Sequence, residues 1–233
     1  MLRFLLSFCA ALLFLTGSAQ TLVPTAEPVM LVVGEDGTTT EETSYEGSAP
    51  LRVRFEAHPK DLNGRSARYE WRFVKSGETE PFLVRYDEDT EFEFFESGTF
   101  SIQLLATFGQ GDGIVNFEMD TPFTIVVSES KLEVPNAFTP NGDGINDVFR
   151  VKEGHRSLVQ FRAIVVNRWG KKVAEWTDPN DGWDGRVGGS EAPDGAYYLM
   201  ITARGADGRN YNIKKTINLL RKYEENATGG IGG

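Results

Sequence analysis

The segment most able to do chemistry is a polar loop at residues 134–149, which reads V-P-N-A-F-T-P-N-G-D-G-I-N-D-V-F. Oxygen-bearing side chains recur at every second position through Thr139, Asn141 and Asp143, and Gly144 and Asp147 follow. This spacing is typical of part of a calcium loop, in which oxygen ligands alternate and a glycine permits a sharp bend. Asn141, Asp143 and Asp147 are therefore candidate calcium ligands.

A structural role for the same side chains is the alternative. A calcium loop that starts at Thr139 needs a bidentate glutamate at its twelfth position, and that position is Arg150. Asn and Asp side chains also cap backbone N–H groups in rigid turns, which needs no metal. The two interpretations differ in one respect, because only the first predicts that calcium raises the melting temperature.

Trp183 and Asp184, in the Gly-rich stretch 177–194, are a second candidate site. A tryptophan face beside a carboxylate can stack on a sugar ring, whereas the same indole can instead plug one end of a β-sandwich while Asp184 holds the loop through hydrogen bonds. We expect Trp169 and Trp176 to be packing residues.

An acidic run lies in the first half of the chain and could recruit cations or a basic partner. Its charges alternate with Phe92 and Phe94, so a solvated sheet face that discourages edge-to-edge pairing is the alternative. The run comprises Asp87, Glu88, Asp89, Glu91, Glu93 and Glu96.

Catalysis has little support in the sequence. The two histidines, His58 and His155, are not clustered with other metal ligands, and there is no Gly-x-Ser-x-Gly motif. The single cysteine, Cys9, lies within an apolar N-terminal run. We predict that the protein is not an enzyme and needs no cofactor, with calcium as the exception to be tested.

Residues 1–19 have the pattern of a cleaved secretory signal, with Arg3, an apolar run from Phe4 to Leu15 and a small residue at Ala19. No later stretch approaches the roughly 20 apolar residues that a membrane helix needs. Charge is uneven, because residues 21–134 carry 9 Lys and Arg against 22 Asp and Glu, and residues 135–233 carry 14 against 12. An acidic first half argues against nucleic acid as a partner.

The elements that must position these residues are strands. Leu51, Val53 and Phe55 alternate with charged residues, as do Tyr69, Trp71 and Phe73, which is the period of a half-buried strand. Further strands are expected at 29–33, 82–86, 98–104, 114–119, 123–127, 148–151, 159–167, 172–176, 196–204 and 211–220, with Thr38–Ser48 as a loop. We therefore expect an all-β protein of two immunoglobulin-like antiparallel sandwiches, at residues 20–133 and 134–222, followed by a flexible tail at 223–233.

The first half carries the blocks G-S-A-P-L-R-V-R-F-E-A, Y-E-W-R-F and F-x-x-x-G-T-F-x-I-x-L. These blocks resemble the polycystic-kidney-disease (PKD) type of immunoglobulin-like domain. The resemblance implies a domain that presents surfaces or acts as a spacer.

The second half carries the loop 134–149, then F-R-A-I-V-V-N-R-W-G-K-K-V, G-W-D-G, P-D-G-A-Y-Y-L-M-I-T-A and I-N-L-L-R. These five blocks resemble the gliding motility-associated C-terminal domain of Bacteroidetes, also called the type B sorting domain of the type IX secretion system. The motif positions are Pro140, Asn141, Gly142, Asp143, Gly144, Asn146, Asp147, Asn167, Arg168, Trp169, Gly170, Trp183, Asp184, Gly185, Gly195 and Tyr197.

This resemblance implies a route and a partner. The chain would be exported through Sec to the periplasm and cross the outer membrane with help from a PorP/SprF-like outer-membrane protein, to end on the cell surface or outside the cell. It would be either a small cargo or an accessory bound at the outer membrane as part of the secretion or gliding apparatus. A surface adhesin or carbohydrate-binding module is the alternative function.

Overall fold

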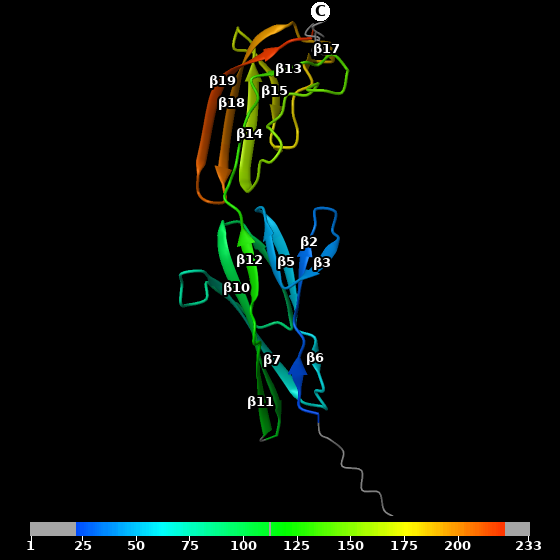
Figure 1. The fold of residues 1–233 in the computed structure, drawn as a ribbon, viewed down its shortest axis with the longest axis vertical. Coiled ribbons are helices and arrows are strands. Elements are labelled where there is room, and N and C mark those ends of the chain that lie inside the picture. The colour runs from blue at the N-terminus through cyan, green and yellow to red at the C-terminus, as the bar shows by residue number, and fades with distance from the viewer. Residues whose placement is uncertain (1–21, 112, 222–233) are drawn as a thin grey trace, which may run out of the picture.

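The computed structural model describes residues 22–111 and 113–221, so the expected signal at 1–19 and the expected tail at 223–233 lie outside the described residues. The described chain is all-β, as the alternating patterns predict, and its strands form two domains arranged end to end (Figure 1). In this part of the chain no helix is long and apolar enough to cross a membrane.

Two facing sheets make up the N-terminal domain. One has the order β3-β2-β5-β9, and the other has the order β4-β12-β10-β7-β8 with β11 paired to β10. The strands are β1 (Thr25–Ala26), β2 (Val29–Val33), β3 (Thr39–Glu42), β4 (Ser44–Gly47), β5 (Leu51–Glu56), β6 (Pro59–Lys60), β7 (Ser66–Lys75), β8 (Leu83–Arg85), β9 (Asp89–Phe94), β10 (Gly98–Gln110), β11 (Gly113–Glu118) and β12 (Phe123–Val127).

The apolar rows of these strands meet between the two sheets. Val53 and Phe55 of β5 face Trp71 and Phe73 of β7, and all four side chains are fully buried. The rings of Phe55 and Phe73 meet edge to face with centroids 5.4 Å apart, a preferred geometry for aromatic pairs. The period-2 pattern of the sequence therefore identifies the core of this domain.

Two expectations about local structure were wrong. The segment Thr38–Ser48 was expected to be a loop, but it holds β3, which pairs with β2, and β4, which pairs in parallel with β12. Both strands lie at sheet edges with largely exposed side chains, so they carry no apolar alternation. Conversely, residues 148–151 form no strand and make only the single bridge between Phe149 and Trp183.

The C-terminal domain has one five-stranded sheet of order β13-β19-β18-β14-β15 and a small β16-β17 hairpin. Its second layer is built mostly from irregular segments. The strands are β13 (Ala137–Phe138), β14 (Leu158–Val166), β15 (Lys172–Trp176), β16 (Arg186–Val187), β17 (Ser190–Glu191), β18 (Gly195–Gly205) and β19 (Asn210–Leu219).

The core of this domain lies between the sheet and the irregular layer. The sheet contributes aliphatic side chains together with the aromatic ones of Phe161, Trp176 and Tyr197, and β13 and the irregular layer add further aromatic side chains. The buried residues include Ala163, Val165, Leu199, Ile201, Ile217 and Leu219 from the sheet, and Phe138, Phe149, Val151 and Trp183 from β13 and the loops. The apolar residues at 148–151 are thus core anchors of a loop, which explains why they resemble a strand in sequence.

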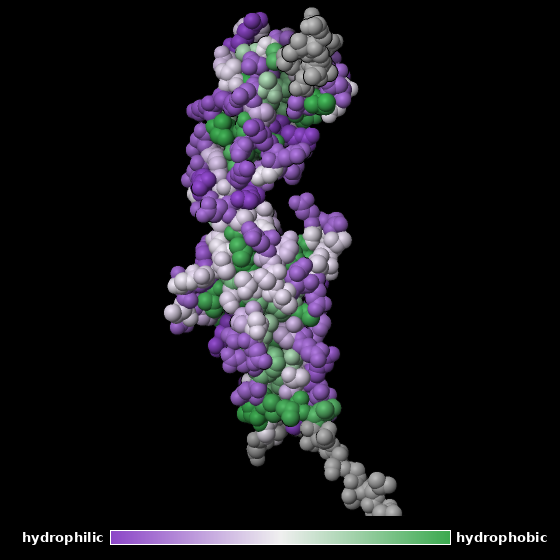
Figure 2. Space-filling model, viewed as in Figure 1, coloured by the Kyte–Doolittle hydropathy of each residue, from purple (hydrophilic) through white to green (hydrophobic). Residues whose placement is uncertain are grey.

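The two domains meet through the β18-β19 turn and the residues before β14. Ser157 is buried, and its Oγ accepts a hydrogen bond from the backbone N–H of Ala49 at 3.2 Å. Ala206 packs against the N-terminal core, and its carbonyl accepts a hydrogen bond from the N–H of Ser97 at 3.0 Å. Outside such contacts the visible surface is mainly hydrophilic, with apolar patches in both domains (Figure 2).

Candidate functional site

The polar loop at 139–147 is organised by its own side chains. The carboxylate of Asp147 accepts hydrogen bonds from the backbone N–H groups of Gly142 at 2.7 Å and Gly144 at 2.8 Å. Asp143 Oδ1 accepts another from the N–H of Ile145 at 2.7 Å. The amides of Gly142 and Gly144 hold the pKa of Asp147 below its usual range, because they stabilise the ionised form.

The three candidate calcium ligands lie in this loop, and their oxygens are already engaged. The amide of Asn141 donates to Asp143 Oδ2 at 2.9 Å, while both oxygens of Asp147 face backbone amides. Within the described residues, no group of three or more His, Cys, Asp or Glu side chains is placed to hold a metal ion. Calcium would therefore have to compete with these hydrogen bonds, and the calcium site and the metal-free capped turn both stay hypotheses for this loop.

Trp183 fills the end of the C-terminal core, where its side chain is 3% exposed. Its Nε1–H donates to the carbonyl of Arg186 at 2.8 Å, and its ring lies 5.3 Å from Phe138 and 4.8 Å from Tyr197. Asp184 Oδ1 accepts a hydrogen bond from the N–H of Arg186 at 2.9 Å. A buried indole offers no face to a sugar ring, so this tryptophan packs and does not form a stacking platform.

Arg221 joins the irregular layer to the end of the last strand, a role that was not predicted from the sequence. Its guanidinium donates to the carbonyls of Ala192 at 2.6 Å and Gly185 at 2.7 Å. Asp194 accepts a hydrogen bond from the backbone N–H of Arg221 at 3.1 Å. A charged side chain that satisfies loop carbonyls here holds the segment 185–194 in place.

The turn between β14 and β15 presents an exposed aromatic residue. Asn167 Oδ1 accepts hydrogen bonds from the N–H groups of Trp169 at 3.1 Å and Lys171 at 3.0 Å, and Gly170 supplies the positive φ of 77° that the turn requires. Trp169 is 75% exposed, and the Arg168 guanidinium lies 4.3 Å from its ring centroid. The expectation that Trp169 is a packing residue was therefore wrong, whereas Trp176 is buried as expected.

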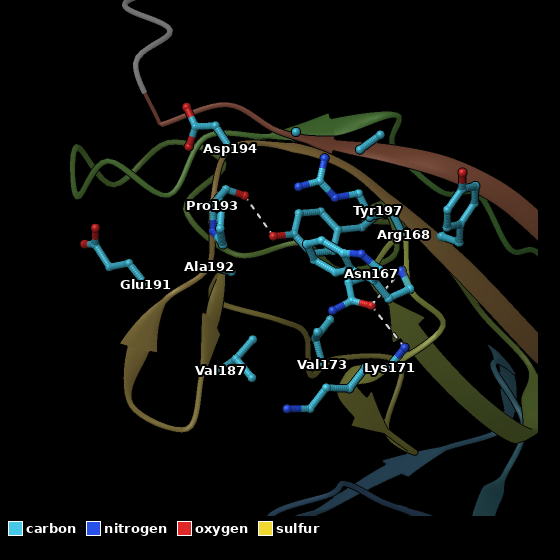
Figure 3. Close-up of a pocket in the computed structure, with 14 residues that line it drawn as sticks. Asn167, Arg168, Lys171, Val173, Val187, Glu191, Ala192, Pro193, Asp194 and Tyr197 are labelled. Carbon is cyan, nitrogen blue, oxygen red and sulfur yellow. Dashed lines mark hydrogen bonds between the residues drawn. The ribbon is translucent and has the colours of Figure 1, made fainter.

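A groove of about 500 Å³ separates this turn from the segment that leads into β18 (Figure 3). Val173 and Val187 line it with apolar surface, and Glu191 and Asp194 add carboxylates. Tyr197 lies beside it, and its hydroxyl donates to the carbonyl of Pro193 at 2.8 Å (Figure 3). Burial raises the pKa of Tyr197, so the phenol remains a neutral donor.

The structure sorts the motif positions into two groups. Asn167, Arg168, Trp169, Gly195 and Tyr197 line the groove. Most of the remaining positions fix the irregular layer, in which Pro140 approaches Gly185 so closely that an added Cβ at Gly185 would lie 2.9 Å from it. The exposed side chain of Trp169, the guanidinium of Arg168 and the groove together form a surface that can bind a partner.

The comparison with protein families decides what this domain is. Residues 132–219 match the family model of the CHU_C Type IX secretion signal domain. The C-terminal domain is a type IX secretion signal domain. The matched residues contain the whole of the five-stranded sheet, the polar loop and the groove, while Arg221 lies just beyond them. A type IX secretion signal domain implies export, association with the type IX secretion system, and a final place on the cell surface or outside the cell.

Other comparisons add little about function. No curated protein matches the chain. The solved structures that the chain matches include the FN1–FN3 domains of chicken CNTN1, at 11% identity over 76% of this chain and 62% of that one with a TM-score of 0.32. Another is Bacteroides ovatus SGBP-B in complex with a mixed-linkage heptasaccharide, at 13% identity over 76% of this chain and 42% of that one with a TM-score of 0.25. The chain thus spans less than two thirds of either structure.

Proposed function

We propose that this chain is a non-catalytic exported protein that acts by protein–protein recognition, with its secretion signal domain read by the type IX apparatus. The exposed turn at Arg168 and Trp169 is the observation that carries the proposal. A large aromatic side chain that is 75% exposed and held by a hydrogen-bonded turn is not needed for the core. Tryptophan and arginine are the residue types most enriched where protein partners bind tightly.

The proposed route starts with Sec export directed by residues 1–19 and continues across the outer membrane. There a PorP/SprF-like outer-membrane protein contacts the secretion signal domain, and the groove beside Trp169 is the surface offered to it. The N-terminal domain, with its PKD-like sequence blocks, is the part that is displayed.

Export from a type IX-competent host tests the first part of this proposal. We expect Trp169→Ala to lower the exported fraction by at least about tenfold, because an anchor residue is lost, and deletion of residues 132–233 to abolish export. Ile114→Ala is the matched control, since Ile114 is 68% exposed but lies in the N-terminal domain. Unchanged export of the deletion variant would refute the proposed function.

Cargo and accessory roles are separated by what purifies with the chain. An accessory of the secretion or gliding apparatus should copurify with an outer-membrane barrel protein in fixed stoichiometry, whereas cargo should be recovered mainly from the culture fluid or the washed cell surface. Cross-linking in intact cells followed by mass spectrometry makes this measurement on the full chain.

A surface adhesin or carbohydrate-binding role is the second candidate, and the exposure of Trp169 supports a sugar-stacking platform there, whereas Trp183 is buried. Trp169 and Tyr198 are both exposed beside the groove, at 75% and 47%, with carboxylates of Glu191 and Asp194 nearby. A glycan array probed with wild type and Trp169→Ala tests this role. Binding that is lost in the variant would support it.

A further inference from the structure

The N-terminal domain has an open sheet edge at β9. This strand ends the order β3-β2-β5-β9, and among the described residues no strand pairs with its outer side. Its side chains alternate, with Thr90, Phe92 and Phe94 toward the other sheet and Asp89, Glu91 and Glu93 on the outer face. An open edge of this kind offers unpaired N–H and C=O groups to another extended chain.

An aromatic groove of about 340 Å³ lies beside this edge. Phe82, which precedes β8, is 49% exposed, and its ring lies 5.8 Å from the rings of both Phe92 and Phe100. Phe94 and the exposed Phe95 add to the apolar lining, and the ion pair between Lys75 and Glu96, at 3.0 Å, lies at its border. Because β8 has only three residues, it leaves Phe82 exposed and Phe92 partly exposed at the groove, while Phe94 and Phe100 form its buried floor.

The charges on the outer face of the sheet indicate what the next strand should carry. Arg52 of β5 stands opposite Glu93 of β9 in the register and Arg54 stands opposite Glu91, and both guanidinium groups lie 3.5 Å from the Glu91 carboxylate. Cross-strand pairs of opposite charge are stabilising, and like charges directly opposite are destabilising. A strand added beyond β9 should therefore place basic side chains next to Glu91 and Glu93.

We propose that β9 is a docking edge for an extended segment in which basic and apolar residues alternate. The segment adds as an extra strand, so its backbone pairs with β9. Its apolar side chains enter the groove against Phe82 and Phe92, and its basic side chains face Glu91 and Glu93. A second copy of this chain does not fit the edge, because β9 paired with itself would set glutamate against glutamate.

Synthetic peptides test the proposal. The probe is a seven-residue peptide of sequence KVKFKVK, and the comparison peptides are its acidic counterpart EVEFEVE and a scrambled KKKVFVK. We expect saturable binding of the alternating basic peptide to the full mature chain by fluorescence anisotropy, weakened by added salt because the charges are screened. Amide hydrogen exchange of the complex should show new protection in β9, because strand addition pairs its backbone.

Two variants locate the contact. Phe82→Ala removes a ring of the groove, and Glu91→Gln with Glu93→Gln removes the outer charges. Each should weaken peptide binding by at least about tenfold. Tyr86→Ala is the matched control, because Tyr86 is 70% exposed, lies close to Phe82 in the chain and does not line the groove. Thermal melts of each variant separate lost binding from lost folding.

Several outcomes would overturn the proposal. One is equal binding of the basic and acidic peptides, and another is binding that Phe82→Ala leaves unchanged in a folded variant. Absence of saturable binding by KVKFKVK at millimolar concentration would also refute it. A dimer in sedimentation that Phe82→Ala dissociates would assign the groove to a second copy instead. None of these results depends on how the chain is exported.

Discussion

Two tryptophans in the secretion signal domain show how far surroundings decide a residue's role. Trp183 is buried among Phe138 and Tyr197, while Trp169 stands on a turn with only Arg168 stacked on it. Both follow polar or glycine-containing sequence, so residue type and neighbours in the chain do not distinguish them. Burial distinguishes the two tryptophans, and it predicts different effects on stability when each is replaced by alanine.

We expect Trp183→Ala to lower the free energy of unfolding by about 3–5 kcal/mol, the usual cost of truncating a buried tryptophan. Trp169→Ala should change the free energy of unfolding by no more than about 0.5 kcal/mol, because truncating an exposed side chain removes few packing contacts. Urea unfolding of both variants measures the difference. A loss below about 1 kcal/mol for Trp183→Ala would contradict the burial that the packing argument needs.

Asp147 gives the polar loop a dependence on pH. Amides of Gly142 and Gly144 stabilise its carboxylate, so its pKa is lower in the folded than in the unfolded protein. This contribution is fully present above the unfolded pKa of about 3.9 and is lost as the pH falls through the folded pKa. Asp147→Asn should therefore be less stable than wild type at neutral pH, with a smaller difference in acid.

Wild type and Asp147→Asn also test whether this loop binds calcium. The engaged oxygens of Asp147 predict that millimolar calcium leaves the melting temperature of the wild-type chain unchanged. A rise in wild type that is absent in Asp147→Asn would instead establish a calcium site in this loop.

At the scale of elements, the sequence predicts strands that alternate and misses those that do not. The apolar rows of β5, β7 and β18 come from a period of two, and the register that buries them follows. The edge strand β3 is polar on both faces and β4 has only Tyr45 packed on the core, so their pairing partners define them. The irregular layer of the secretion signal domain has no period at all.

The candidate site, too, could be predicted from the sequence only in part. Turn chemistry in the sequence identifies the loop at 139–147 and the turn at 167–170, because Asn, Asp and Gly occupy fixed places in turns. The groove was not predictable, since it forms between segments about 20 residues apart, one of which is held by hydrogen bonds from Arg221. A lone arginine after the last strand has no local signature.

Gly185 tests how tightly this irregular layer packs. Its φ is 76°, and an added Cβ would lie 2.9 Å from Pro140 and 3.0 Å from the Arg221 guanidinium. We expect Gly185→Ala to cost about 2–4 kcal/mol in unfolding free energy from backbone strain and crowding together. Gly170→Ala is the matched control, because its φ of 77° is similar but nothing lies within 4 Å of the added atom. Equal losses would show that crowding contributes nothing.

At the scale of the molecule, the junction makes one body of two domains. The β18-β19 turn enters the N-terminal domain through Ala206, and Asp207 in the same turn holds the linker residue Ser130 through its Oγ at 2.7 Å. Ser157 connects to both Ala49 and Ser128. Such a junction fixes the direction of the N-terminal domain relative to the secretion signal domain.

Ala206→Asp should break this coupling without unfolding either domain. A carboxylate at that position would lose its hydration on packing against the N-terminal core. Burying an unpaired charge in this way costs free energy. NMR relaxation should show one rotational correlation time for both domains in wild type, and separate, shorter times in the variant. Lys214→Asp, an exposed position away from the junction, should keep the single time. Independent tumbling already present in wild type would mean that the linker, and not the β18-β19 turn, determines how the N-terminal domain is oriented.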